Sequence, residues 1–110
     1  MDTETINTLK ILEESVSGME EMTSGPYGPF SKNWLTSAFI ENTRSGIEHC
    51  LTVLVQVTNS MVANADDLTN LAEKYPHEHQ IKNLKKRYHA SITHLMSMVD
   101  MLEEWYNQRT

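Results

Sequence analysis

The chain has 110 residues, a formal net charge of −6 and 39% hydrophobic residues. This length supports one small domain, and the acidic balance argues against nonspecific nucleic-acid binding, which needs a basic surface. The single cysteine excludes an internal disulfide. No apolar run approaches the roughly 20 residues of a membrane span, and the first residues lack the apolar core of a signal peptide. We therefore expect a single helical domain over residues 1–110, located in the cytoplasm and without membrane contact.

The first helix is expected over residues 3–23, with Asp2 or Thr3 as its cap. Apolar residues recur at a three-four-three spacing that places them on one helix face: Leu9, Leu12, Val16 and Met19. Gly18 within this helix costs about 1 kcal/mol relative to alanine. Either this cost is tolerated, or another helix approaches closely at that point.

A loop rich in glycine and proline is expected over residues 24–30, because it holds two Gly-Pro pairs. Ser31 then fits the cap of the next helix. The aromatic residues Tyr27, Phe30 and Trp34 gather at this corner. They are expected either to close one end of a helical bundle or to dock a partner.

The middle helix, expected over residues 31–75, carries the strongest pattern in the sequence. Its apolar residues recur at intervals of seven: Ile40, Ile47, Leu54, Met61, Leu68 and Tyr75. A companion row follows four positions later: Leu51, Thr58, Ala65 and Ala72. Seven residues make two turns of a slightly under-wound helix, so both rows share one face that needs a packing partner. The helix is expected to kink, if anywhere, at Ser45-Gly46, and Pro76 should end it.

The last helix is expected over residues 78–108 and repeats the same pattern. Its two rows are Ile81, Tyr88, Leu95 and Leu102, and then Leu84, Ser91, Met98 and Trp105. Two heptad helices joined by a short proline turn predict an antiparallel hairpin. The expected fold is all-α, an elongated three- to four-helix bundle built on this long antiparallel helical hairpin with heptad packing. Helix lengths suggest that the first helix packs beside the first half of the middle helix, and the last helix beside its second half.

The five histidines do not form a metal-binding pattern. His89 and His94 are five residues apart, so their side chains leave a helix about 140° apart. The sequence holds no Glu-x-x-His motif and no cysteine pair, which helical metal sites commonly use. We therefore expect neither a metal nor a cofactor.

Two Arg/His pairs give a different indication. Arg44 and His49 have the spacing Arg-x4-His, and Arg87 and His94 have the spacing Arg-x6-His. Both resemble the Arg-x(4–6)-His signature of HEPN-type helical ribonucleases, in which two motifs meet across a dimer. The resemblance implies that His49 transfers a proton and that Arg44 steadies the scissile phosphate. Ser45 departs from the Asn, Asp or His often found after the arginine.

A second resemblance concerns the middle helix. Trp34 follows a loop after a first helix, and the long helix ends in Leu71-Ala72-Glu73-Lys74-Tyr75. This arrangement is similar to the second helix of the WXG100 proteins that type VII secretion exports. Trp34-Leu35-Thr36 departs from the family's Trp-x-Gly turn.

The residues themselves favour a small, acidic, non-enzymatic module for protein–protein interaction that presents helix faces. Its expected partners are another protein and a second copy of itself, and an adaptor, an inhibitor or a secretion helper all fit this description. The HEPN-like ribonuclease, with Arg44 and His49 as its catalytic pair, and the WXG100-like protein stay as alternatives. Partner contact is expected at aromatic and apolar residues: Tyr27, Phe30, Trp34, Ile40, Ile47, Trp105 and Tyr106.

Overall fold

The structure, a computed structural model, describes residues 1–23 and 44–108. These residues form three helices, α1 (Thr3–Thr23), α3 (Arg44–Lys74) and α4 (His79–Gln108). The two described segments contain no strand, so the predicted all-helical class is confirmed. None of the three helices is long and apolar enough to cross a membrane. The glycine- and proline-rich loop and the start of the expected middle helix lie outside the described residues.

Helix α1 begins with a side-chain cap and buries one stripe. The Asp2 carboxylate oxygen Oδ1 accepts a hydrogen bond from the Thr5 backbone N–H at 2.8 Å, which satisfies one of the free donors at the helix start. Hydrogen bonds from Thr5 lower the pKa of the Asp2 carboxyl. A Cβ built on Gly18 would meet nothing within 4 Å, so no neighbouring helix requires a glycine at that position.

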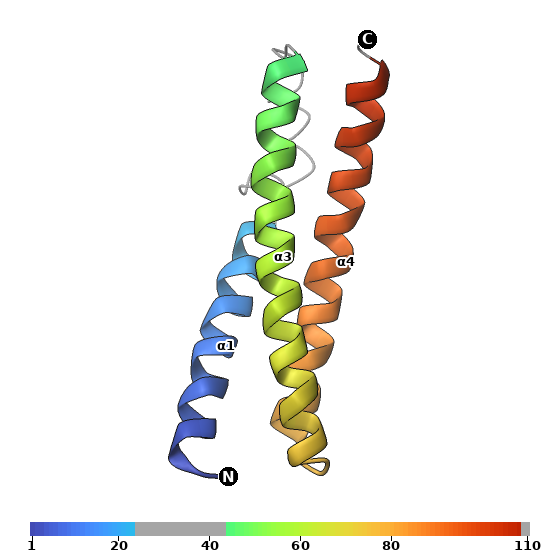
Figure 1. Cartoon of the computed structure of the whole chain (residues 1–110). Coiled ribbons are helices and arrows are strands. Elements are labelled where there is room, and N and C mark those ends of the chain that lie inside the picture. The colour runs from blue at the N-terminus through green and yellow to red at the C-terminus, as the bar shows by residue number, and fades with distance from the viewer. Residues whose placement is uncertain (24–43, 109–110) are drawn as a thin grey trace.

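Helices α3 and α4 lie side by side, and α4 runs back along α3 (Figure 1). α3 ends at Lys74, next to the residue that precedes Pro76. The Tyr75 N–H still donates to the Leu71 carbonyl at 2.8 Å, and the Glu78 N–H donates to the Tyr75 carbonyl at 3.3 Å. Pro76 has no N–H to continue the α3 ladder, so the chain reverses within this short turn.

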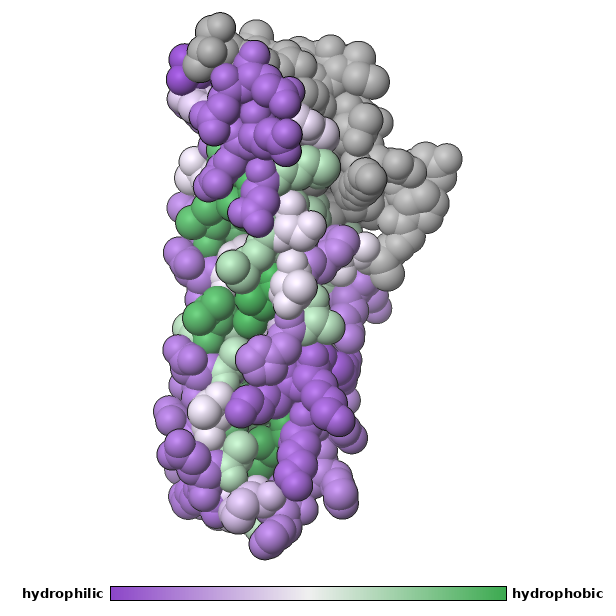
Figure 2. Space-filling model, turned by 90° about the vertical axis from the view of Figure 1, so that its right-hand side faces the viewer, coloured by the Kyte–Doolittle hydropathy of each residue, from purple (hydrophilic) through white to green (hydrophobic). Residues whose placement is uncertain are grey.

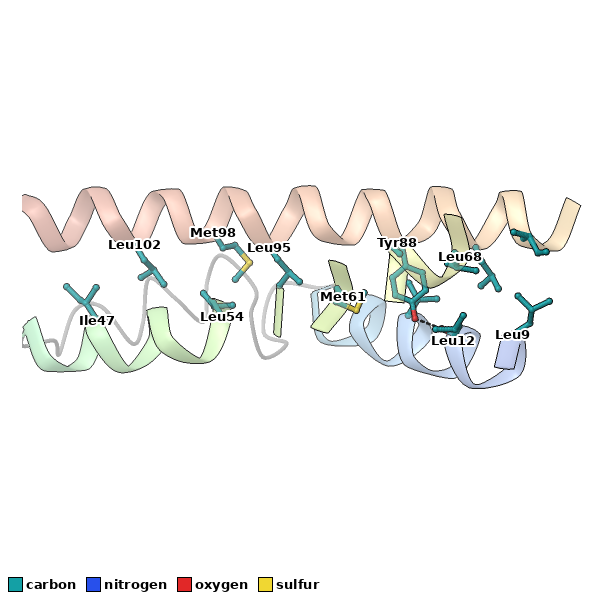
Figure 3. Packing of buried hydrophobic residues seen from close by; sticks show 14 residues of the cluster. Leu9, Leu12, Ile47, Leu54, Met61, Leu68, Tyr88, Leu95, Met98 and Leu102 are labelled. Carbon is teal, nitrogen blue, oxygen red and sulfur yellow. Dashed lines mark hydrogen bonds between the residues drawn. The ribbon is translucent and has the colours of Figure 1, made fainter. Parts of the chain in front are cut away.

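The core runs along the seam between the helices (Figure 3). On α3 the buried residues include four spaced by seven: Ile47, Leu54, Met61 and Leu68. On α4 the corresponding residues are Ile81, Tyr88, Leu95 and Leu102, joined by Leu84 and Met98. α1 adds Leu9, Leu12 and Val16. Ile47 lies near Leu102 at one end of the seam, and Met61 lies near Tyr88 further along (Figure 3).

Helix α1 lies beside the end of α3 and the start of α4, close to the turn between them (Figure 1). Asn64 of α3 donates a hydrogen bond to Ser15 of α1 at 3.5 Å, and Arg87 of α4 pairs with Glu20 of α1. The expectation that α1 packs beside the first half of the middle helix, and α4 beside only the second half, is therefore wrong. The reason is length: α4 has 30 residues and the described α3 has 31, so α4 packs along all of it.

Candidate functional site

An ion-pair cluster around Arg87 fastens α1 to α4. The Arg87 Nε donates to both carboxylate oxygens of Glu20 at 3.2 Å, and Nη2 donates to the Ser17 hydroxyl at 3.0 Å. Nη1 lies 3.7 Å from the Glu13 carboxylate. Glu13, Ser17 and Glu20 are spaced by four and three residues, so they share one face of α1. The guanidinium lowers the pKa of the Glu20 carboxyl, chiefly through these hydrogen bonds, and the carboxylate raises the pKa of Arg87.

A buried polar network lies next to this cluster. The hydroxyl of Tyr88, a residue with 0% exposure, donates to the Leu12 carbonyl of α1 at 2.7 Å. The Asn64 amide of α3 donates to the same hydroxyl at 3.3 Å and to the Ser15 hydroxyl at 3.5 Å. One tyrosine therefore joins all three helices. Both sets of contacts hold α1 in place.

The α1 contacts define which side of the α3–α4 pair is covered. Val62 precedes Asn64 by two residues, so their side chains leave α3 about 160° apart. Met96 follows Arg87 by nine residues, so their side chains leave α4 about 180° apart. Val62 and Met96 are therefore on the side of the pair that faces away from α1.

A shallow groove lies on that side, and we call it the open face. It is lined by Val55, Thr58, Asn59, Met96, Val99 and Asp100. The exposed fractions are 41% for Val55, 41% for the neighbouring Val62 and 53% for Met96, which are high values for large apolar side chains. Seen from the α4 side, apolar side chains form an interrupted column along the length of the molecule (Figure 2). Exposed apolar groups that cluster in a groove with polar neighbours are typical of a binding surface.

A third set of contacts joins the start of α3 to the end of α4. The Arg44 guanidinium carbon lies 4.3 Å from the centre of the Tyr106 ring, a cation–π distance. The Tyr106 hydroxyl donates to the Glu48 carboxylate at 2.7 Å. These contacts tie the two helix ends together.

The expected partner-binding residues fall into three groups. Tyr27, Phe30, Trp34 and Ile40 lie outside the described residues. Ile47 has an exposed fraction of 0% and lies in the core near Leu102, so a partner does not reach its side chain in this arrangement (Figure 3). Trp105 and Tyr106 are half-buried and pack against the core.

The two Arg/His pairs of the ribonuclease resemblance lie on different helices. Arg44 and His49 are both exposed on α3, and five residues separate their directions by about 140°. Arg44 stacks on Tyr106, and Arg87 is committed to Glu20. Both arginines of the two motifs therefore make contacts that hold the fold.

Within residues 1–23 and 44–108, no group of three His, Cys, Asp or Glu side chains has a metal-binding arrangement. Cys50 is half-buried beside the core, and burial raises the pKa of its thiol.

The sequence reasoning missed the open face. A signal was present, because Val55 and Val62 each follow a core residue, Leu54 or Met61, by one position. Met96 follows Leu95 in the same way. Apolar residues one position beyond the buried row widen the apolar stripe toward one side of the α3–α4 pair.

Comparison with known proteins assigns no role to these residues, so the geometry of the site is the basis for a proposal. No family model matches the sequence, and no curated protein and no solved structure is found to match the chain.

Proposed function

We propose that this chain is a non-enzymatic helical module for protein–protein interaction, and that it binds through the open face. In this proposal α3 and α4 form an antiparallel, heptad-packed hairpin that acts as a rigid scaffold. The observation that carries the proposal is the exposure of Val55, Val62 and Met96 together on the side opposite α1. Burying such side chains against another protein removes apolar area from water, which favours association.

The residue types of the open face support a protein partner. Methionine is enriched at the centre of protein–protein interfaces, and its flexible side chain adapts to a partner surface. Met96 and Val99 line the groove with apolar side chains, while Asn59 and Asp100 in its lining offer a hydrogen-bond donor and a charge. Protein interfaces typically combine apolar and polar side chains.

The contacts of the arginines favour this module over the HEPN-like ribonuclease. Arg87, in the second Arg/His pair, binds Glu20 and Ser17 of α1 and so acts in folding. Arg44, in the first pair, lies over the Tyr106 ring. Binding a phosphate would require Arg87 to exchange its contacts with Glu20 and Ser17.

Site-specific photo-crosslinking tests the proposal in the cells that produce the protein. A photoreactive amino acid replaces Asn59 on the open face, and the matched control replaces Glu14 on the outer side of α1. We expect discrete covalent adducts with protein from position 59 that are lost when Met96→Glu is added. Equal labelling from positions 59 and 14, or none from position 59, contradicts the proposal.

A nuclease assay tests the enzymatic alternative separately. Purified protein is incubated with RNA beside a His49→Ala variant, and we expect no cleavage from either. Cleavage that the substitution abolishes would establish the ribonuclease and overturn the non-enzymatic proposal.

A further inference from the structure

We propose that the occupant of the open face is a second copy of this chain, bound face to face with its helices running in the opposite direction. This inference rests on the proposed function and adds the identity and orientation of a partner. The observation that supports it is a set of charged residues on α4, which lie along the helix on both sides of Met96.

Two pairs of opposite charges are arranged symmetrically along α4. Lys82 and Glu103 are three heptads apart, and Lys86 and Asp100 are two heptads apart, so the members of each pair share a stripe of the helix. The midpoint of the first pair falls between Ile92 and Thr93, and that of the second pair falls on Thr93. The basic pair members lie on the side toward the turn, and the acidic ones toward the end of the chain. The stripe is therefore basic at one end and acidic at the other, with His89, Thr93 and Met96 between them.

These charges are exposed and available. Lys82, Lys86, Asp100 and Glu103 are all exposed, and none of them forms an ion pair with a residue that the structure describes. The ion pairs found in the described segments are both made by Arg87, on the side of α1. Lys82, Asp100 and Glu103 thus lack ion-pair partners among the described residues. Lys86 lies at the outer edge of the stripe, where it also lines a hollow beside Glu13 and Arg87 and makes no ion pair with a described residue.

A two-fold axis through the midpoint near Ile92 satisfies both pairs at once. It places Lys82 opposite Glu103 of the second copy and Lys86 opposite Asp100 of the second copy, and each contact occurs twice. In a symmetric dimer the same surface must complement itself, and this stripe does so only when the two α4 helices run in opposite directions. With both α4 helices in the same direction, lysine would meet lysine.

The same axis brings the apolar part of the face together. Met96 is then opposite His89 of the second copy, whose ring offers an apolar surface. Val55 and Asn59 lie near the middle of the interface, because they line the same groove as Met96 and Val99. The apolar centre supplies the affinity, whereas exposed charge pairs mainly fix the orientation and disfavour other pairings.

Sedimentation equilibrium of the purified full chain tests whether the face self-associates. We expect the wild type to be partly dimeric at tens of micromolar, and Met96→Glu or Val62→Lys to weaken dimerisation at least tenfold. Both variants should keep the helical circular dichroism of the wild type, because these side chains lie outside the core. The control Glu14→Lys, on the outer side of α1, should dimerise like the wild type. A wild type that stays monomeric at these concentrations overturns the inference.

Charge reversal tests the orientation. Lys82→Glu with Lys86→Glu makes both ends of the stripe acidic, and Asp100→Lys with Glu103→Lys makes both ends basic. Each double variant alone should dimerise more weakly than the wild type, whereas their mixture and the fourfold variant should recover dimerisation. Failure of both the mixture and the fourfold variant to recover it rejects the antiparallel pairing.

The outcomes separate this inference from the proposed function. A monomeric purified chain that is nevertheless crosslinked from position 59 to a different protein in cells rejects the second copy and keeps the interaction module. A monomeric chain without such adducts rejects both.

Discussion

The Tyr88 hydroxyl of α4 lies 2.7 Å from the Leu12 carbonyl oxygen of α1 and donates a hydrogen bond to it. The carbonyl belongs to the backbone of α1, so the bond fixes how α1 sits along α4. Asn64 of α3 donates to the same hydroxyl, and Tyr88 is fully buried. This contact keeps α1 on one side of the α3–α4 pair and so leaves the open face uncovered by α1.

Replacing Tyr88 with phenylalanine should lower the free energy of unfolding by about 1–2 kcal/mol. The ring still fills its place in the core, but the Asn64 amide loses an acceptor and the hydrogen bond to Leu12 is lost. Urea denaturation measures the change. The control is Tyr75→Phe, because the Tyr75 hydroxyl makes no hydrogen bond with the described residues and its loss should change little. Equal effects at the two positions would show that the Tyr88 network does not stabilise the fold.

Replacing Glu20 with glutamine should destabilise the protein at neutral pH and much less in acid. The side chains of Arg87 and Glu20 are 33% and 42% exposed, so solvent screening limits the ion pair to about 0.5–1 kcal/mol. Arg87 holds the pKa of Glu20 below its ordinary value near 4.5. The stabilisation is therefore fully present above about pH 4.5 and is lost as the pH falls through the lowered pKa.

Denaturation of the wild type and Glu20→Gln between pH 3 and pH 7 measures this difference. The two stability curves should converge at the acid end. Glu14→Gln is the control, and its curve should follow that of the wild type throughout. Curves for Glu20→Gln that stay parallel to the wild type would show that the Arg87–Glu20 ion pair adds no pH-dependent stability.

Replacing Gly18 with alanine should stabilise the protein by about 0.5–1 kcal/mol. The position is inside α1, and the added methyl group meets no atom within 4 Å. Alanine loses less backbone entropy in a helix than glycine does. Thermal or urea denaturation measures the gain, and a loss of stability would mean that α1 requires a glycine there.

Truncating two adjacent residues of α3 should affect two different properties, folding stability for one and self-association for the other. Leu54 has an exposed fraction of 0%, so Leu54→Ala should cost about 2–5 kcal/mol of folding stability. Val55 is 41% exposed, so Val55→Ala should leave folding nearly unchanged but weaken self-association. Denaturation and sedimentation on the same samples separate the two effects. A large loss of folding stability in Val55→Ala would place that side chain in the core instead.

The all-helical class could be predicted because the signals for it are local. The apolar rows have helical spacing along each segment, Asp2 has the right side chain for a cap, and proline cannot continue a helix. Asp2 does cap α1, and α3 ends at Lys74, two residues before Pro76. These features depend on residues near one another in the chain.

The position of α1 could not be predicted in the same way. It depends on contacts between residues far apart in the sequence, such as Arg87 with Glu20 and Tyr88 with Leu12. The spacing of residues in the sequence predicts neither contact. Several acids on α1 could equally have met a base on α4. The sequence predicts that Ile47 contacts a partner, but α4 extends along α3 as far as Ile47, which is buried near Leu102 (Figure 3).

The sequence gives only a weak signal for the open face. Val62 and Met96 look like ordinary surface residues until the side covered by α1 is known. The symmetry of Lys82 with Glu103, and of Lys86 with Asp100, suggests a pairing of two copies only once the open face is known to adjoin this stripe of α4.

Pulsed electron paramagnetic resonance between spin labels tests the pairing of two open faces most directly. Single cysteines for labelling replace Asn59, near the proposed two-fold axis, or Glu73, near the turn, in a Cys50→Ala background. The account predicts a distance between copies below about 25 Å, or about two helix diameters, for labels at position 59. For labels at position 73 we expect roughly 40–45 Å, because the rise of 1.5 Å per residue adds up over two helices that run in opposite directions. Short distances at both positions, or no distance between copies at either, would contradict it.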